Sequence, residues 1–484
     1  MQEYPLIGAS HVSSLRLWIG YATKEKHYIM STSQQWSSKL GFLYATAGSA
    51  IGLGAIWKFP YIAGTSGGGA FFVLFLSFTL LIGVPLLIGE YMLGRHSRAD
   101  AITTYRKIAP KSIWKATGWL GVITCFLILS FYSVIGGWSI LYLGSSLTGQ
   151  LSGLDADGFN IRFGELISNP YLAVGAQALF LGLSAGIVAK GVQKGIERAS
   201  KWMIPALFIL LVVLAGYSLT LEGAREGLSF LFKPDWSNVS GDVVLFALGQ
   251  SFFALSLGVS VMVTLSSYAS KKQDLPLSAM TLGGMNIVVA MLAGIVIFPG
   301  VFTFGLEPSE GPTLIFAAVP TIFSQMPYGQ LLVILFFILF FFAALSTAFS
   351  LLEIIVAAFI KGDVTKRQKS SWIFAFLVLL MGVPSTLSFG LIENWQFFGM
   401  PFFDFVDFTV SNIFMPIGAL LISLFLLFKV RRSVLLGEFK QGSIFGQRLF
   451  AFWYAIMAII VPVAITVVLV DQLFGLNILS LLFT

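Results

Sequence analysis

The chain has little charge for its size. Asp, Glu, Lys and Arg make up only 11% of its 484 residues, whereas 57% are hydrophobic. A soluble protein of this length carries roughly 25% charged residues. Most of this chain therefore cannot face water, which excludes a soluble globular fold.

Cysteine and histidine are also scarce. The single cysteine, Cys125, excludes an intrachain disulfide and gives no cysteine-based metal cluster. The three histidines, His11, His27 and His96, lie outside the long apolar runs. These absences argue against metal-based or histidine-based chemistry within a membrane.

Long apolar runs fill most of the chain. Because a membrane-spanning helix needs about 20 mostly apolar residues, the runs predict an all-α membrane protein with about eleven transmembrane helices. The predicted spans are 39–64, 69–94, 116–147, 170–188, 197–220, 241–269, 276–304, 329–361, 371–389, 398–429 and 447–470. The last stretch, 471–484, is too short to span and is predicted to be an interfacial or packed tail.

Basic residues predict the orientation, because loops rich in Lys and Arg stay on the cytoplasmic side. With a cytoplasmic N-terminus, most of the 29 Lys and Arg residues lie inside, and an odd number of spans places the C-terminus outside. We therefore expect a multi-pass protein of the cell inner (plasma) membrane. The net charge of +7 then needs no nucleic-acid partner.

Residues 1–35 form a predicted cytoplasmic tail. They lack the continuous apolar region of a signal peptide. Two interpretations of residues 1–29 stay open: a regulatory tail, or an upstream start chosen where Met30 is the true first residue. The second is preferred.

Two predicted spans contain small residues at mid-depth. The first reads Gly48-Ser-Ala-Ile-Gly52-Leu-Gly54, and the sixth reads Gln250-Ser-Phe-Phe-Ala-Leu-Ser256-Leu-Gly258-Val-Ser260. Such residues can simply allow close helix packing. Their matching positions in two five-helix halves favour broken helices at a transport site. Backbone groups freed at a break need polar partners, which a cation and a carboxylate would supply.

These motifs, in this order, resemble the neurotransmitter:sodium symporter family, close to its prokaryotic amino-acid transporters with the leucine-transporter fold. The resemblance extends from about Trp36 to Val470. The motifs that carry it are Trp36-Ser-Ser-Lys-Leu-Gly-Phe, Gly48-Ser-Ala-Ile-Gly-Leu-Gly-Ala-Ile-Trp-Lys-Phe-Pro60, Gly67-Gly-Gly-Ala-Phe71, Gly83-Val-Pro-Leu-Leu-Ile-Gly-Glu90, Gln250 to Gly258, Gly311-Pro-Thr-Leu-Ile-Phe316, Ser346-Thr347 and Asp404-Phe-Val-Asp407-Phe.

The resemblance implies a 5+5 inverted repeat with broken helices 1 and 6 plus one peripheral helix. A single transporter domain, 36–470, would then contain repeat one at about 36–220, repeat two at about 241–430 and helix 11 at about 447–470, followed by the tail 471–484.

The resemblance also implies two sodium sites. At site 2 the family's ligands fall on the carbonyls of Gly48, Ile51 and Ala343 and the hydroxyls of Ser346 and Thr347, a set of hard oxygen donors. The alternative for these hydroxyls is a hydrogen bond back to their own helix. The matching carbonyls in the first span favour the sodium site.

Sodium site 1 is less complete. The carbonyls of Ala50 and Ala254 and the side chain of Asn286 match the family, but its usual asparagine falls on Ala55, and a hydroxyl is missing at Ala254. We therefore expect one or two sodium ions.

Two further departures concern the anion and the substrate. Phe75 and Ala290 stand where chloride-dependent relatives carry hydroxyls, so chloride is not expected. Gly52 stands where carriers of biogenic amines have an aspartate. This favours a zwitterionic amino acid over an amine without a carboxylate.

The predicted substrate site has a polar and an apolar part. Val259 replaces a phenylalanine of some relatives and predicts room for bulky or aromatic side chains, whereas a charged side chain would lie unpaired. The residues expected around the substrate backbone are Ala50, Gly54, Tyr132, Phe253, Ala254, Ser256 and Thr347. Those expected around its side chain are Ile128, Val259 and Leu351, with Phe253.

The resemblance assigns gates and supports. Lys58 and Asp407 match the extracellular gate, where the family usually has an arginine in place of the lysine. Trp36 matches the cytoplasmic plug, but its usual arginine partner falls on Ser33 and the acidic one on Lys361, with Asp363 nearby. Glu90 and Glu353 match carboxylates that support the broken helices by accepting hydrogen bonds from freed backbone N–H groups, and Gln250 is a further expected support.

We therefore predict a sodium-coupled symporter that takes up neutral, hydrophobic amino acids by alternating access, with no enzymatic activity. The partners are the amino acid, sodium and the lipid bilayer. Two alternatives stay open: a proton-coupled amino-acid carrier of the same architecture, and a non-transporting amino-acid sensor. The oligomeric state is not predicted.

Overall fold

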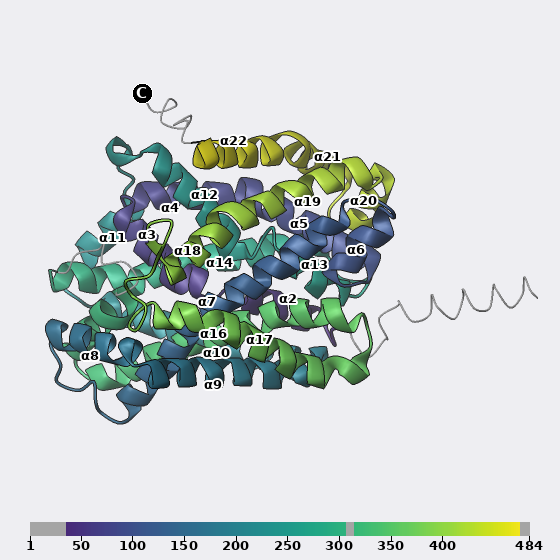
Figure 1. Cartoon of the computed structure of the whole chain (residues 1–484). Coiled ribbons are helices and arrows are strands. Elements are labelled where there is room, and N and C mark those ends of the chain that lie inside the picture. Colours follow the sequence, from purple (N-terminus) through teal and green to yellow (C-terminus); the bar gives the residue numbers. More distant parts are fainter. Residues whose placement is uncertain (1–34, 306–313, 475–484) are drawn as a thin grey trace, which may run out of the picture.

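The computed structural model describes residues 35–305 and 314–474 as a bundle of long, roughly parallel helices (Figure 1). Within these residues, nine continuous helical stretches are long and apolar enough to cross a membrane. Their elements are α4 (Gly69–Phe78), η3 (Thr79–Gly83) and α5 (Val84–Ser97); α7 (Lys115–Leu147); α9 (Pro170–Ala189); η4 (Val192–Glu197) and α10 (Arg198–Ser218); α14 (Leu275–Thr303); α16 (Gly329–Ile360); η7 (Val364–Lys366) and α17 (Arg367–Leu387); α18 (Phe402–Phe408), η8 (Thr409–Phe414) and α19 (Met415–Lys429); and α21 (Gln447–Ala455), η9 (Ile456–Ile460) and α22 (Val461–Phe474).

Two further spans are interrupted, as the sequence predicts. The first consists of α2 (Lys39–Ala50) and the stretch Gly54–Thr65, made of η2 (Gly54–Lys58) and α3 (Phe59–Thr65), with a bend of 48° between them. The sixth consists of α12 (Gly241–Leu255) and α13 (Val261–Ser267). With the nine continuous stretches, they account for the eleven spans predicted from the apolar runs.

Span ends differ where helices continue beyond the apolar run. The ninth span begins at Val364 and not at 371, because its first turns are polar. The last span extends to Phe474, so the predicted tail 471–484 begins within a helix. Residues 1–34 of the predicted tail 1–35, including Ser33, and the first half of the 311–316 motif lie outside the described residues.

Several short elements connect the spans. They were not predicted, because they are too short or too polar to read as spans. They are α6 (Ala101–Ile108), α8 (Ala156–Ser168), α11 (Ala224–Phe232), η5 (Trp236–Asn238), η6 (Leu314–Ala318), α15 (Val319–Ser324), α20 (Arg432–Lys440) and the antiparallel pair β1 (Gln396–Phe397) and β2 (Met400–Pro401).

Local backbone conformation explains both interruptions. Ile51, the residue that directly follows α2, has φ −88° and ψ 75°, outside the helical region. In the sixth span, Ser256 and Ser260 adopt left-handed conformations on either side of Gly258, which has φ +80°. A left-handed non-glycine residue costs about 1–2 kcal/mol, so contacts around the break must offset this cost.

The interrupted helices lie within the bundle. α16 packs against α7 and α2, and α10 packs against α2, α14 and α16. α21 and α22 run along one edge, consistent with a peripheral last span (Figure 1). In the sixth span, α12 packs against α4, and α13 packs against α5 and α16, so continuous helices contact both interrupted spans.

Candidate functional site

The two helix breaks line one small buried cavity of about 20 Å³, little more than the space for one water molecule. α7, α16 and α19 supply the rest of its wall. The lining residues are Ser49, Ala50, Gly52, Gly54, Ile128, Tyr132, Phe253, Ser256, Val259, Thr347, Leu351 and Met415. All residues predicted to bind substrate are among them except Ala254.

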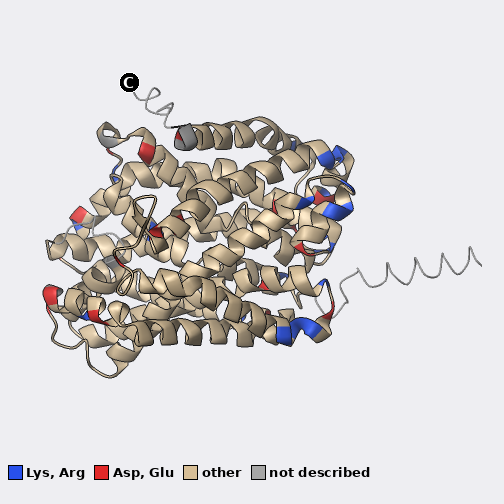
Figure 2. Ribbon diagram, in the orientation of Figure 1, with Lys and Arg blue, Asp and Glu red and all other residues tan. Residues whose placement is uncertain are grey.

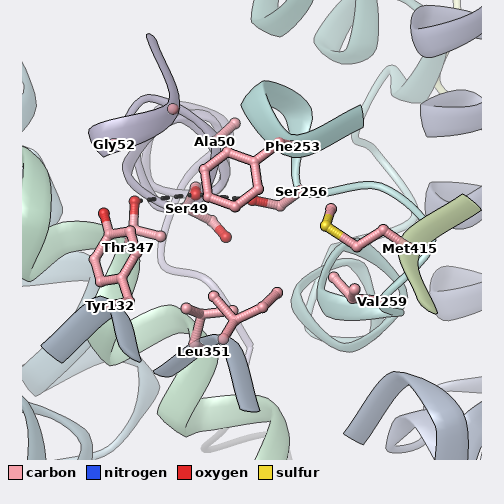
Figure 3. A pocket seen from close by; sticks show the side chains of 12 residues that line it. Ser49, Ala50, Gly52, Tyr132, Phe253, Ser256, Val259, Thr347, Leu351 and Met415 are labelled. Atoms are coloured by element: carbon pink, nitrogen blue, oxygen red, sulfur yellow. Dashed lines mark hydrogen bonds between the residues drawn. The ribbon is translucent and has the colours of Figure 1, made fainter. Parts of the chain in front are cut away.

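One side of the cavity is polar. The Tyr132 hydroxyl accepts a hydrogen bond from the Leu53 backbone N–H, freed at the break in the first span, at 3.2 Å. The Ser256 hydroxyl donates to the Ser49 carbonyl at 3.0 Å. Figure 3 shows Tyr132 and Thr347 grouped on this side. Backbone groups of the broken helix are thus satisfied by side chains that also face the cavity.

The other side is apolar. Figure 3 shows Val259 and Met415 away from the Tyr132 hydroxyl, with Leu351 beside them and the Phe253 ring across the cavity. None of the lining residues is charged. The cavity therefore offers hydrogen bonds at one end and only carbon and sulfur at the other.

Oxygen atoms gather between α16 and the break in the first span. The Thr347 hydroxyl donates to the Gly48 carbonyl at 3.1 Å and lies 3.2 Å from the Ser49 carbonyl. The Ser346 hydroxyl donates to the Ala343 carbonyl at 3.0 Å. Ser346 thus bonds to its own helix, as the alternative interpretation expected, whereas Thr347 reaches across to the other one. Four of the five ligands predicted for sodium site 2 form these two contacts, and Ile51 follows on the same break.

Asn286 on α14 lies at the predicted sodium site 1. Its Nδ2 donates to the carbonyls of Ala254 at 2.7 Å and Ala50 at 3.4 Å. Its Oδ1 is buried and has no hydrogen-bond partner among the described residues. Ala55 is fully buried and, like Ala254, contributes no side-chain oxygen.

An ion pair covers the cavity on one side. Lys58 Nζ lies 3.0 and 3.1 Å from the two carboxylate oxygens of Asp407 and 3.1 Å from the Ser411 hydroxyl. The same ammonium lies 4.6 Å from the centre of the Phe253 ring, a cation–π contact. Beyond them is a second cavity of about 240 Å³, lined by Asp404 and Asp407 among others. Lys58 and Phe253 thus lie between the two cavities.

Trp36 lies at the opposite end of the first span. It is buried, and its indole N–H donates to the Leu265 carbonyl of α13 at 2.9 Å. Its ring contacts Tyr268 edge to face, with the centroids 5.8 Å apart. These contacts fasten the start of the first span to the end of the sixth.

Comparisons with known proteins assign the family. The model of the Sodium:neurotransmitter symporter family matches residues 33–157 and 173–481. An uncharacterized sodium-dependent transporter of Bacillus subtilis, YhdH, is 53% identical over 90% of this chain and 97% of its own length. An uncharacterized sodium-dependent transporter of Haemophilus influenzae is 36% identical over 91% of this chain and 98% of its own length.

The chain belongs to the sodium:neurotransmitter symporter family. A solved structure agrees in fold: MhsT in complex with L-phenylalanine has a TM-score of 0.86 and 44% identity, over 90% of this chain and 99% of that one. As a member of the family, the chain is a sodium-dependent, multi-pass membrane transporter and not an enzyme.

The symporter's supporting residues follow the prediction in part. Glu90, fully buried, accepts a hydrogen bond from the Gly258 N–H at 2.9 Å, and Gln250 donates to the Gly54 carbonyl at 2.6 Å. Glu353 differs from the prediction: its carboxylate contacts Arg367 at 2.5 and 3.0 Å and accepts from the Tyr268 hydroxyl at 2.7 Å. It therefore joins α16 to α17 and to the end of the sixth span, through an arginine and not a freed backbone group.

Some residues of the symporter site were missed from the sequence. Met415 lines the cavity without a distinctive motif, and Ser49, although it lies within the Gly48 to Gly54 motif, was given no role. Arg367 has the same sequence context as the exposed basic residues near it, although it is buried. Lys361 is exposed and Asp363 pairs with Lys366 at 3.1 Å, so neither of these residues completes a gate with Trp36.

Proposed function

We propose that this symporter couples sodium to the uptake of neutral, hydrophobic amino acids by alternating access. The observation that carries the proposal is the two-sided cavity at the helix breaks, next to grouped oxygen atoms and free of charged lining residues. The 44% identity to MhsT, which was solved in complex with L-phenylalanine, supports the substrate class.

The substrate's two ends would meet different surroundings. Its carboxylate would lie near the Tyr132 hydroxyl and the freed amides of the first span, with the rest of its backbone near Ala50, Gly54, Phe253, Ser256 and Thr347. Its side chain would contact Ile128, Val259, Leu351 and Met415. A charged side chain there would lose its water without gaining a partner, which costs several kcal/mol or forces it to neutralise.

Substrate binding requires the cavity to expand. About 20 Å³ holds one water molecule, far less than any amino acid. Phe253, which is only partly buried, and Met415, which has an unbranched side chain with several rotatable bonds, are the lining side chains that we expect to move. Opening of the Lys58–Asp407 contact would join the cavity to the 240 Å³ space beyond it.

Bound sodium would take the place of the hydrogen bonds that the hydroxyls of Ser346 and Thr347 now donate to backbone carbonyls. The hydroxyl groups would keep their protons and turn their oxygen atoms towards the ion. At site 2, the carbonyls of Gly48, Ile51 and Ala343 and the hydroxyls of Ser346 and Thr347 provide five oxygens. At site 1, turning the Asn286 amide would direct its unpartnered Oδ1 towards the carbonyls of Ala50 and Ala254. Site 1 is thus the poorer of the two. Phe75 and Ala290, both buried and without donors, support independence from chloride.

We further propose a cytoplasmic N-terminus, an external C-terminus and a plasma-membrane location. Figure 2 supports this: Lys and Arg gather at the end of the bundle where α6 and α20 lie, opposite the end with α8 and α11. Lys58–Asp407 would then close the outer side and Trp36 the inner side.

The test is uptake into proteoliposomes with an imposed sodium gradient. Leucine, phenylalanine, tryptophan, tyrosine, alanine and glycine are compared, and we expect accumulation of the larger apolar ones. Ser346→Ala and Thr347→Ala should each reduce sodium stimulation about ten-fold or more. Each variant loses a hydroxyl that would contact the ion, and a polar contact to a charged group is worth about 1.5–3 kcal/mol.

Ser350→Ala is the matched control. Ser350 lies one turn after Ser346 on the same helix. Its hydroxyl donates to the Ser346 carbonyl and faces no proposed ligand. Full sodium-dependent accumulation by both test variants would overturn the ion site. Uptake driven by a proton gradient without sodium would support the proton-coupled alternative, and binding without accumulation would support the sensor.

A further inference from the structure

A separate pocket of about 310 Å³ lies where the ends of α5, α6 and α19 meet the start of α20. Its lining residues are His96, Ser97, Lys107, Ile108, Lys429, Val430, Arg431 and Val434. Three of these residues, Lys107, Lys429 and Arg431, are basic, and none is acidic. The basic residues of the pocket come from segments that are far apart in sequence, so the fold brings their charges together.

Two of the three cations, Lys429 and Arg431, are not neutralised by the acid beside the pocket. Glu438 is engaged with Arg95 at 2.7 Å and His96 at 3.5 Å, on the neighbouring surface. Lys429 and Arg431 form no ion pair with any described residue. The pocket therefore presents a surplus of positive charge.

Helix dipoles do not account for all of this charge. Lys107 and Lys429 lie in the last turns of α6 and α19, where a cation is favourable. Arg431, however, is the residue before the first turn of α20, and that turn contains no acidic residue. A cation at a helix start is unfavourable. An anion bound between the cations would remove this conflict.

Apolar side chains beside the cations indicate the kind of anion. Phe428 directly precedes Lys429 and is 72% exposed, and Ile113, which follows α6, is 85% exposed. If the helices cross the bilayer as proposed, such exposed apolar side chains at the end of a span would meet acyl chains. In the proposed topology the pocket would then lie at the boundary between hydrocarbon and headgroups, at the end of the bundle where Lys and Arg gather (Figure 2).

We infer that this pocket binds the phosphate headgroup of an anionic phospholipid of the cytoplasmic leaflet. Lys429 and Arg431 contact the phosphate, Lys107 lies beside it, and Phe428 contacts the lipid's acyl chain. Basic pockets between membrane helices on the cytoplasmic side are suited to this chemistry. The bound lipid would tie the ends of α5 and α6 to α19 and α20.

The test compares lipid retention by full-length protein in nanodiscs of phosphatidylethanolamine with a minority of phosphatidylglycerol. Native mass spectrometry counts the phosphatidylglycerol that stays bound on release. Removing each cation should weaken retention about five-fold, so Lys429→Gln combined with Arg431→Gln should lose most of it. Lys107→Gln alone should give the smaller loss.

The matched control is Lys190→Gln combined with Lys194→Gln. These lysines are also exposed, and Lys190 also ends a helix, α9, but neither lines the pocket. Equal retention by the two double variants would overturn the site. If inorganic phosphate displaced the lipid from the wild-type protein as efficiently as added phosphatidylglycerol does, the pocket would be a free-anion site. This result would also overturn the lipid proposal.

Discussion

Tyr132 has two tasks at the residue scale, because its hydroxyl accepts from Leu53 N–H and can still donate its own proton into the cavity. Tyr132→Phe removes both contacts. We expect substrate affinity to fall about 10- to 100-fold, the value of a lost hydrogen bond to a charged group. Equilibrium binding of L-phenylalanine measures it.

The matched control for this variant is Tyr142→Phe on the same helix. The Tyr142 hydroxyl is buried and has no hydrogen-bond partner among the described residues. Its loss should leave affinity within about two-fold of wild type, since no hydrogen bond is broken. Similar losses in both variants would mean that Tyr132 acts only through packing.

Lys58 contacts both oxygens of Asp407 and the Ser411 hydroxyl without the planar fork of an arginine. The pair is partly exposed, with 15% and 27% of the two side chains accessible, so it contributes about 1 kcal/mol or less. Asp407→Asn should slow uptake about five-fold, as a gate that stays open longer, yet change affinity little. Wild-type uptake rates for this variant would remove the gate role.

The element scale is where the sequence was most informative. Apolar runs predicted all eleven spans, because the bilayer imposes a length and hydrocarbon excludes charge. Clusters of glycine and serine predicted both breaks. What the sequence could not give is pairing between elements: Arg367 and Lys366 are neighbours, but only the fold shows that Arg367 is buried against Glu353 while Lys366 is exposed.

Gly52 shows how the break in the first span depends on close approach. A Cβ at this position would lie 2.8 Å from the Tyr132 hydroxyl oxygen and 3.0 Å from the Thr347 Cβ. Gly52→Ala should therefore disturb substrate and sodium sites together, reducing affinity for both about ten-fold or more. Gly216→Ala, where added atoms meet nothing within 4 Å, is the control. If only the substrate affinity or only the sodium affinity fell, the claim that one break forms part of both sites would be wrong.

At the scale of the whole molecule, Glu438 links α20 to α5 through Arg95 and His96. Burial raises the pKa of Glu438, but hydrogen bonds from His96 and Arg95 outweigh it, and the net pKa lies below its ordinary value. A carboxyl with a lowered folded-state pKa stabilises the protein above its unfolded pKa, and this stability is lost as pH falls through the folded value.

Glu438→Gln should therefore destabilise the protein at neutral pH by about 1–3 kcal/mol, with the difference from wild type shrinking as the pH falls. Thermal unfolding of both proteins in detergent, measured from neutral to acidic pH, gives this difference in stability. Lys190→Gln, which removes an exposed charge, is the control. A difference that stays constant with pH would show that the carboxylate's charge is not what holds the two helices.

Sodium and amino acid share the same two helix breaks in this account, so each should bind more tightly when the other is present. The most direct measurement is the affinity of the purified transporter for L-phenylalanine in sodium chloride and in matched choline chloride. We predict affinity about ten-fold or more higher in sodium, with most of the difference lost in Thr347→Ala. Equal affinity in both salts, or an undiminished sodium effect in Thr347→Ala, would contradict it.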